Sequence, residues 1–255
     1  MTVGSEHDVQ GLKVAGHAVA TVLQRMLAAI QPGMTTRELD EMGARWLAEF
    51  GARSAPMTSY NFPGATCISV NEEAAHGIPG DRVIAKGDVV NVDVSAELDG
   101  YFADTGGTRI VPPTTPTKTQ LVFAAQYALD QAIKEVRHGV KLNRIGHAIE
   151  RVAKAHKFKI IENLCSHGVG RSLHEEPKSI PGYFDANDTR VLTEGMVITI
   201  EPFLSTKSRW VDEGADGWTL SGIKGNLSAQ FEHTMIVTRG APVIVTTTGA
   251  AAGAH

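Results

Sequence analysis

Cysteine is scarce in this chain. Cys67 and Cys165 are the only two among 255 residues, and they stand in no CxxC or CxxxC spacing. A disulfide framework or a zinc finger needs more cysteines at closer spacing, so we expect neither and predict a reducing compartment. Long apolar runs are missing too: none reaches the roughly 20 residues that span a bilayer. The opening MTVGSEHDVQ lacks the apolar stretch of a signal peptide. Together these absences predict a cytoplasmic protein.

An excess of charge of one sign is also absent. The 24 Lys and Arg residues nearly balance the 28 Asp and Glu residues, which leaves a formal net charge of −4. Because nucleic acids and anionic membranes attract a basic surplus, we expect neither as a partner. What is present is an ordinary apolar share of 42%. In a chain of this length that share is enough for one large domain with a core.

Several motifs of common enzyme classes are missing as well. The chain has no GxSxG and no GxxxxGK[ST], which argues against that type of serine hydrolase and against a P-loop nucleotide site. Cys67 lies in ATCISV, a run typical of a buried strand, with no glycine-rich elbow around it. A thiol nucleophile at this position is therefore not favoured.

The order of predicted elements occurs twice along the chain. In each half, two helices at 3.6-residue spacing precede strands rich in β-branched residues. Thr35 and Glu38 fit a capping box at the start of the second helix, and Gly51 fits its end. The sequence predicts a single domain over residues 1–255, of α+β class. It has approximate halves at 8–111 and 117–240, a proline-rich connector between them, and a tail at 247–255 that we expect to be disordered.

Two aspartates interrupt the strands of the first half. Asp93 lies in VVNVDVS, and Asp104 lies eleven residues further on, across the turn at Asp99–Gly100. In an ideal hairpin about that turn, Asp93 faces Gly106. Asp104 is two residues from Gly106 and therefore lies on the same face of the sheet. The two carboxylates can approach each other.

Two glutamates interrupt predicted strands of the second half, at residues 195–205 and 228–238. Glu201 and Glu232 stand symmetrically about Asp216–Gly217, so they meet if the strands pair around that loop. A single acid in a strand more commonly lies at an edge or caps a turn. Four buried carboxylates would repel one another, and no Lys or Arg adjoins any of them in the sequence. The matched pairs therefore predict two divalent cations, with Glu232 as a bridge.

Three histidines are candidates to join these acids. His167 and His174 stand seven apart in CSHGVGRSLHEEP, a spacing that suits a loop and a strand rather than one helix face. His76, in HGIPG, is the third. Each taken singly is more readily a surface or core histidine with a backbone partner. His167 is the best candidate for an imidazole ligand in an oxygen-rich site, which suits Mn, Co, Fe or Zn. Alternation points His233 away from Glu232.

Five motifs together resemble one known family. They are NFPGATCISVNEEAAHGIPG, GDVVNVDVSAELDGYFADTGGT, SHGVGRSLHEEP, GMVITIEP and SAQFEHTMIVT. Over about residues 8–240 the chain resembles the type I methionine aminopeptidases in their short bacterial form. The resemblance implies the pita-bread fold, in which two pseudo-symmetric halves pack helices on antiparallel sheet around a dinuclear metal site. The chain lacks the zinc-binding extension of the longer type I enzymes and the helical insertion of type II.

The resemblance also implies a role for each candidate residue. Five positions match the metal ligands of the family: Asp93, Asp104, His167, Glu201 and Glu232. They would hold two divalent ions (Co, Mn, Fe, Zn or Ni), with Asp104 and Glu232 bridging, His167 and Glu201 completing one ion, and Asp93 the other. The expected catalytic residues are His76 and His174, which match the histidines that contact substrate, and Glu201, which can also move a proton.

Further positions match the pocket for the methionine side chain. Phe62, Cys67 and Trp218 fall where the family lines that pocket. Leu173 stands where many relatives carry an aromatic residue, and Pro56 and Ser59 also differ from the common pocket residues. These departures bear on the shape of the pocket rather than on the chemistry.

The implied function is metal-dependent, hydrolytic removal of the initiator methionine from nascent proteins and peptides, with a preference for a small second residue. We expect a cytoplasmic monomer that acts near the ribosome. Two alternatives share the fold. One is an X-Pro aminopeptidase or prolidase, which usually carries an additional N-terminal domain. The other is a non-catalytic pita-bread binding protein, in which ligands are lost.

Overall fold

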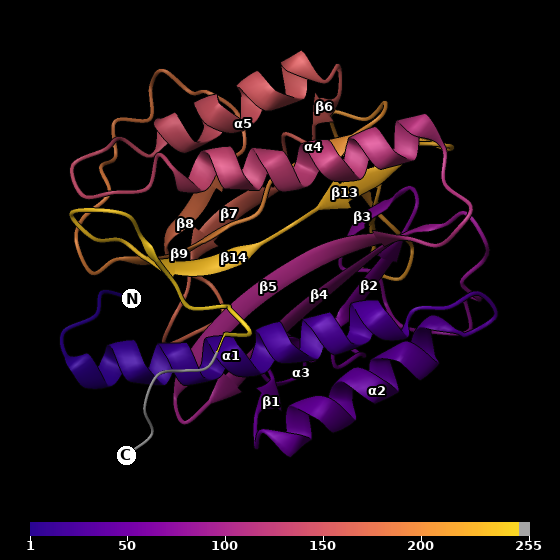
Figure 1. Ribbon diagram of the computed structural model, residues 1–255, viewed down its shortest axis with the longest axis horizontal. Helices are drawn as coiled ribbons and strands as arrows, with labels where there is room; N and C mark the ends of the chain where they lie inside the picture. The colour runs from indigo at the N-terminus through magenta and orange to yellow at the C-terminus, as the bar shows by residue number, and fades with distance from the viewer. Residues whose placement is uncertain (250–255) are drawn as a thin grey trace.

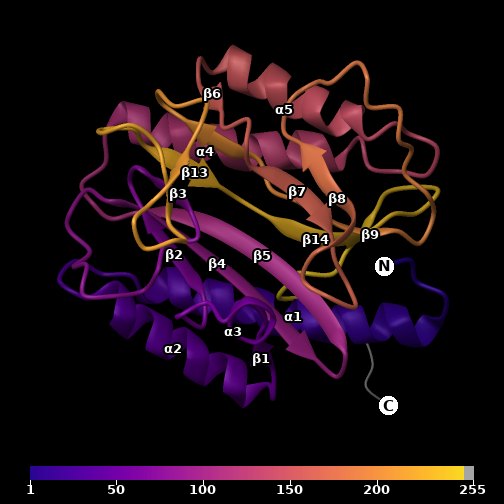
Figure 2. The ribbon, with the colours of Figure 1, turned by 180° about the vertical axis from the view of Figure 1, so that it is seen from behind.

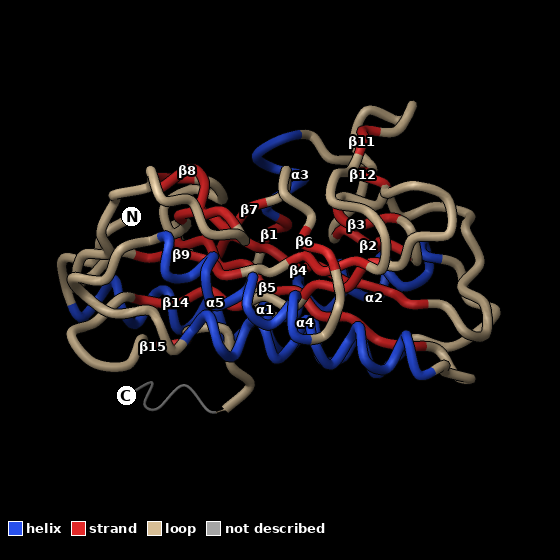
Figure 3. Tube along the Cα trace, turned by 90° about the horizontal axis from the view of Figure 1, so that it is seen from above, coloured by secondary structure: helices blue, strands red, loops and turns tan. Residues whose placement is uncertain are grey.

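The computed structural model describes residues 1–249 and has its strands between two pairs of helices. Figures 1 and 2 show β4, β5, β13 and β14 lying between α1 and α2 below and α4 and α5 above. In Figure 3, α1 and α4 lie on one side of the strands, and α3, β11 and β12 lie on the other. Residues 250–255 of the tail expected to be disordered lie outside the described part of the chain.

The N-terminal half begins with two helices whose ends follow local signals. Ser5 accepts a hydrogen bond from the Asp8 amide, Thr35 and Glu38 form the predicted capping box, and Gly51 has a left-handed φ of 71°. The elements of this half are α1 (Glu6–Ala29), α2 (Thr36–Glu49), β1 (Arg53–Ser54), α3 (Ala55–Tyr60), β2 (Cys67–Val70), β3 (Glu73–Ala75), β4 (Val89–Leu98) and β5 (Tyr101–Ile110).

The strands β4 and β5 form the predicted hairpin. The turn residues Asp99 and Gly100 have φ values of 51° and 82°, as a type I′ turn requires. Asp93 pairs with Gly106, which confirms the predicted register and puts Asp104 on the same face. Strand β4 also pairs with β1 and β2, so this sheet has four strands.

The C-terminal half contains two long helices and shorter strands. Helix α4 ends at Ile133, with Lys134 as its C-cap. Strands β15, β14, β9, β7 and β8 form one sheet in that order, and β13, β10 and β6 form another. The elements are α4 (Pro116–Ile133), α5 (Asn143–Ala155), β6 (Lys159–Ile160), β7 (Cys165–Gly168), β8 (Glu175–Pro181), β9 (Val197–Ile200), β10 (Phe203–Ser205), β11 (Asp212–Glu213), β12 (Leu220–Ser221), β13 (Ser228–Gln230), β14 (His233–Ile236) and β15 (Val243–Ile244).

Continuous strands over 195–205 and 228–238 were also predicted, and this is wrong. Each run is broken, at Glu201 between β9 and β10 and at Glu232 between β13 and β14. The backbone amide of Glu232 donates to the Gly106 carbonyl over 2.9 Å, and that of Glu201 donates to Ser166 Oγ over 2.9 Å. The register is continuous across the break, because Ile200 pairs with His233 and Phe203 with Gln230. The two glutamates therefore lie opposite each other, as expected.

Each half has its own hydrophobic core, and a polar seam joins the two. Helices α1 and α2 pack on β4 and β5 in one core, and α4 and α5 pack on β9 and β14 in the other. At the seam, Thr105 Oγ1 donates to the Glu232 carbonyl over 2.8 Å, and Asn91 Nδ2 donates to Gln230 Oε1 over 2.8 Å. A Cβ on Gly106 would lie 2.3 Å from Gln230 Oε1, so the halves approach as closely as they do only with glycine there.

No helix within residues 1–249 combines the length and apolar character needed to cross a membrane.

Candidate metal centre

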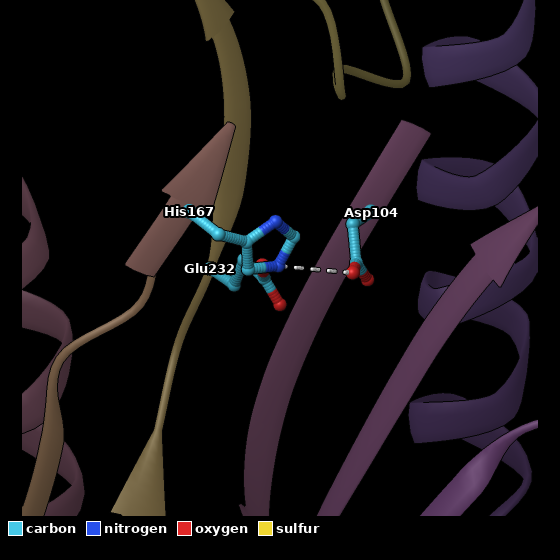
Figure 4. A group of neighbouring side chains, drawn as sticks. All are labelled: Asp104, His167 and Glu232. Carbon is cyan, nitrogen blue, oxygen red and sulfur yellow. Dashed lines mark ion pairs between the residues drawn. The ribbon is translucent and has the colours of Figure 1, made fainter. Parts of the chain in front are cut away.

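Three side chains from different elements converge at the seam (Figure 4). Asp104 of β5, His167 of β7 and Glu232 each offer a ligand atom, and these atoms all lie within 4.8 Å of one another. His167 Nε2 lies 3.8 Å from Asp104 Oδ2 and 3.5 Å from Glu201 Oε1. Asp93 lies on the same face of the β4–β5 hairpin as Asp104 and lines the same cavity as Asp104, His167 and Glu201. All five residues predicted as ligands are thus gathered in one place.

The imidazole of His167 presents an unprotonated nitrogen to the acids. His167 Nδ1 lies 2.9 Å from the Gly168 carbonyl oxygen. A carbonyl oxygen only accepts, so Nδ1 carries the proton and Nε2 keeps its lone pair. Burial lowers the pKa of His167 to about 3, which keeps the ring neutral. This is how proteins orient histidines that bind metals.

The carboxyl groups are too buried and too close together to ionise freely. Burial raises the pKa of Asp93 to about 6. Burial followed by the charges of neighbouring acids holds the pKa of Asp104, Glu201 and Glu232 well above the ordinary carboxyl range. These carboxyl groups can ionise together at neutral pH only if a cation lies among them.

Two buried carboxylate oxygens without hydrogen-bond partners indicate that a divalent ion fits this site. Asp104 Oδ1 and Glu232 Oε1 are fully buried and have no hydrogen-bond partner. Such atoms are costly unless something satisfies them. The other Glu232 oxygen, Oε2, accepts from Gln230 Nε2 over 3.0 Å, which fixes the carboxylate. Hard oxygen donors with one neutral imidazole suit Mn, Fe, Co or Zn, so the residues present fit such an ion.

A cavity of about 710 Å³ opens over this cluster. Phe62 and Trp218 meet edge to face on one wall, with ring centroids 5.2 Å apart and planes at 86°. Burial raises the pKa of the Cys67 thiol, so it stays protonated and serves as an apolar wall. The lining residues are Pro56, Tyr60, Phe62, Cys67, Ala75, His76, Asp93, Ser95, Asp104, Asn163, Leu164, Cys165, His167, Leu173, His174, Lys178, Glu201, Phe203, Trp218 and Leu220.

Both candidate substrate histidines lie in this cavity. The His174 ring is 4.2 Å from the His167 ring, centroid to centroid. His76 follows β3 with a left-handed φ of 55°, an uncommon conformation that is enriched at functional sites. Burial lowers the pKa of both histidines, which favours neutral rings. His233 instead pairs through Nδ1 with Thr246 Oγ1 over 2.9 Å.

The sequence did not reveal Tyr60. Its hydroxyl lies 2.7 Å from His174 Nδ1, across 114 residues of chain separation. Pro56 and Leu173, two departures from the family pattern, do line the cavity, whereas Ser59 is not among the lining residues. The one available signal for Tyr60 was its place two residues before Phe62, at the end of a helix too short for a periodic pattern.

Comparison with known proteins gives one consistent family. The model of metallopeptidase family M24 matches residues 10–239. A methionine aminopeptidase of Staphylococcus epidermidis is 46% identical over 247 residues, which cover 96% of this chain and 98% of the relative. The methionine aminopeptidase structure from Thermotoga maritima has a TM-score of 0.93 at 34% identity, covering 97% of this chain and 100% of that one.

A prolidase from Pyrococcus furiosus is similar in fold alone. Its TM-score is 0.76 at 21% identity, and the match covers 98% of this chain but 66% of the prolidase. The predicted pita-bread fold is confirmed by these structures. With a family match over most of its length and relatives of the same span, the chain belongs to the metallopeptidase family M24 and, within it, to the methionine aminopeptidases.

Proposed function

We propose that the protein is a methionyl aminopeptidase, which hydrolyses the bond after the N-terminal methionine of nascent proteins and peptides. The observation that carries this proposal is the pair of unsatisfied carboxylate oxygens, on Asp104 and Glu232, beside a cavity with an aromatic and thiol wall. Together they offer a divalent cation site next to a pocket for an apolar side chain. The similarity to methionine aminopeptidases supports the same reading.

The metal would be held by Asp93, Asp104, His167, Glu201 and Glu232. We propose two ions, because the cluster offers four buried carboxylates whose charge two divalent ions would neutralise. Co, Mn, Fe, Zn and Ni are the candidates. When bound, such ions supply Lewis acidity and bring the pKa of water toward neutrality.

The other residues bind, orient and move protons. His174 would donate a hydrogen bond to the scissile carbonyl oxygen as negative charge develops on it. His76 would orient the peptide at the scissile nitrogen. Glu201 would accept a proton at Oε1, the atom 3.5 Å from His167 Nε2.

Substrate choice follows from the walls of the cavity. Phe62, Cys67 and Trp218 would surround an unbranched thioether, which gains from aromatic contacts. A charged side chain would be desolvated there without a partner. The second substrate residue would lie beside His76, where a small side chain is favoured.

We further propose one catalytic domain over the whole chain, acting as a cytoplasmic monomer near the ribosome. An X-Pro aminopeptidase or prolidase is less well supported, because the prolidase is similar in fold alone at 21% identity, whereas a methionine aminopeptidase is 46% identical. A non-catalytic binding protein is less well supported too, because none of the five ligand positions has been lost.

A peptide panel tests the function. Purified enzyme loaded with Mn or Co is given Met-Ala-Ser, Met-Leu-Ser, Ala-Ala-Ser and an X-Pro peptide, and the released amino acid is quantified. We expect Met-Ala-Ser to be cleaved far faster than the rest. Equal cleavage of Ala-starting or X-Pro peptides would contradict the methionine assignment, and no cleavage of any peptide would favour the binding protein.

A further inference from the structure

Tyr60 contacts a histidine of the site from the opposite half of the molecule. Its hydroxyl oxygen lies 2.7 Å from His174 Nδ1, and the two rings are 5.5 Å apart, centroid to centroid. Both residues line the large cavity. Tyr60 is 44% exposed, so burial in a core does not explain its place.

The short helix α3 aims Tyr60 at this position. Ser54 caps the helix by accepting from the Met57 amide, and Asn61 ends it in a left-handed conformation with φ of 56°. The Asn61 and Phe62 amides donate back to the carbonyls of Met57 and Pro56. This tight C-terminal turn lets Tyr60 and Phe62 face the same cavity.

The backbone around His174 is fixed separately from its ring. Glu175 Oε1 accepts from the amides of Arg171 and Ser172 over 2.5 and 2.7 Å, and Ser172 Oγ donates to the His174 carbonyl over 3.1 Å. These bonds hold the backbone of the loop but do not involve the imidazole, which packs against the His167 ring. Within residues 1–249, the Tyr60 hydroxyl is the group that hydrogen-bonds to a nitrogen of this ring.

We propose that Tyr60 is a positioning residue that donates its hydroxyl proton to His174 Nδ1 and so holds the imidazole in the Nε2–H form. With Nδ1 occupied as an acceptor, the remaining ring nitrogen carries the proton. A neutral imidazole has one donor nitrogen and one acceptor nitrogen, and its partner decides which is which. Nε2–H is then the donor that His174 offers to a substrate carbonyl. The inference rests on the proposed function for the identity of that substrate.

Kinetics of single and double variants test the coupling. We expect Tyr60→Phe to lower kcat on Met-Ala-Ser by about tenfold, the size of one lost hydrogen bond, with KM little changed. In a His174→Ala background the same change should have almost no further effect. Tyr127→Phe, which removes a hydroxyl from the 40% exposed Tyr127 on α4, is the matched control and should equal the wild type.

Two kinetic outcomes would overturn the proposal. An equal loss from Tyr60→Phe in both backgrounds would mean that the hydroxyl does not act through His174. A raised KM with unchanged kcat would mean that Tyr60 binds substrate directly.

A measurement without substrate separates this inference from the proposed function. The zinc-loaded enzyme, labelled with ¹⁵N-histidine, shows which ring nitrogen of His174 carries the proton, and His174→Gln assigns the signals. We expect one Nε2–H form in the wild type and a mixture or the other form in Tyr60→Phe. Identical spectra would overturn the proposal even if the peptide panel succeeds. The expected change would support it even if no peptide is cleaved.

Discussion

The two halves of the molecule hold their acids in different ways. In the N-terminal half, Asp93 and Asp104 lie within an unbroken hairpin of two ten-residue strands. In the C-terminal half, Glu201 and Glu232 lie where paired strands are interrupted. Each aspartate extends toward the acidic cluster from a regular strand, whereas each glutamate lies where its strand is interrupted. There its backbone amide bonds to Ser166 or to Gly106 rather than to the facing strand.

This difference shows which half depends on the other. The hairpin is fixed by its own turn and register, so its aspartates are placed locally. The position of Glu232 depends on a carbonyl and a hydroxyl of the hairpin, through Gly106 and Thr105. Glu232 is therefore placed by contact with the N-terminal half, whereas the Glu201 amide is held by Ser166 of its own half. Disturbing the seam should affect Glu232 first.

The largest expected effect comes from removing a single carboxylate, that of Asp104 in the N-terminal half or that of Glu232 in the C-terminal half. Asp104→Ala and Glu232→Ala should each lower kcat/KM by about three orders of magnitude or more, because metal chemistry is worth several kcal/mol. Both should lose bound metal, as measured by mass spectrometry of metal content. Glu41→Ala removes an exposed acid on α2 and should change neither. Near-normal turnover with metal retained in either variant would refute the shared site.

A smaller effect is expected from the seam itself. The buried Gln230 side chain donates to Glu232 and accepts from Asn91, so it cannot move aside for a methyl group on Gly106. Gly106→Ala should cost roughly 1–3 kcal/mol of unfolding free energy by overpacking and should weaken metal binding. Gly107→Ala meets the end of the flexible Leu27 side chain at 3.0 Å and should cost less. Urea denaturation measures both, and equal costs would contradict the dependence of Glu232 on the seam.

The metal-free protein should show how the acids respond to pH. Its folded state keeps protons on Asp93, with pKa about 6, that the unfolded chain releases near the ordinary value of 3.8. The stability contributed by such acids is full below about pH 4 and is lost as pH rises through about 6. His167, with pKa about 3, acts in the opposite sense: its contribution is present above its ordinary 6.5 and is lost as pH falls.

A variant separates these opposing contributions. Metal-free Asp104→Asn keeps His167 but lacks one of the crowded carboxyl groups. It should be more stable than the metal-free wild type at pH 8, by roughly 1–3 kcal/mol, with a smaller difference at pH 5. Urea denaturation of chelator-treated proteins gives both values. A difference that grows toward pH 5 would contradict the assigned direction of the pKa shifts.

The smallest expected effect concerns the pocket, whose walls come from both halves. Leu173, 4% exposed, lines the cavity from the C-terminal half, and Phe62 does so from the N-terminal half. Leu173→Phe should tighten the pocket and raise the preference for methionine over norleucine or leucine by a few-fold, about 2–10. Phe62→Leu should lower it. The ratio of kcat/KM values for the three N-terminal residues measures this, and an unchanged ratio in one of the two variants would show that one half alone shapes the pocket.

Much of the site could be predicted because its signals are short-range. The turn at Asp99–Gly100 and the two-residue period of strands put Asp93 and Asp104 on one face. Symmetric spacing about Asp216–Gly217 put Glu201 opposite Glu232. The interruption of those strands was not predicted, because β-branched neighbours such as Ile200 and Thr234 give the same pattern whether or not the ladder breaks.

The sequence by itself determined the strand faces, the helix caps and the set of acidic and imidazole side chains, because turn chemistry and residue period act over a few positions. The tertiary structure decided the breaks at Glu201 and Glu232 and the contact of Tyr60 with His174. The partners in these contacts, such as the Gly106 carbonyl and the Ser166 hydroxyl, come from residues 35 to 126 positions away, or 114 for Tyr60 and His174. Groups so far apart in the sequence meet only when the chain has folded, and no local pattern records that meeting.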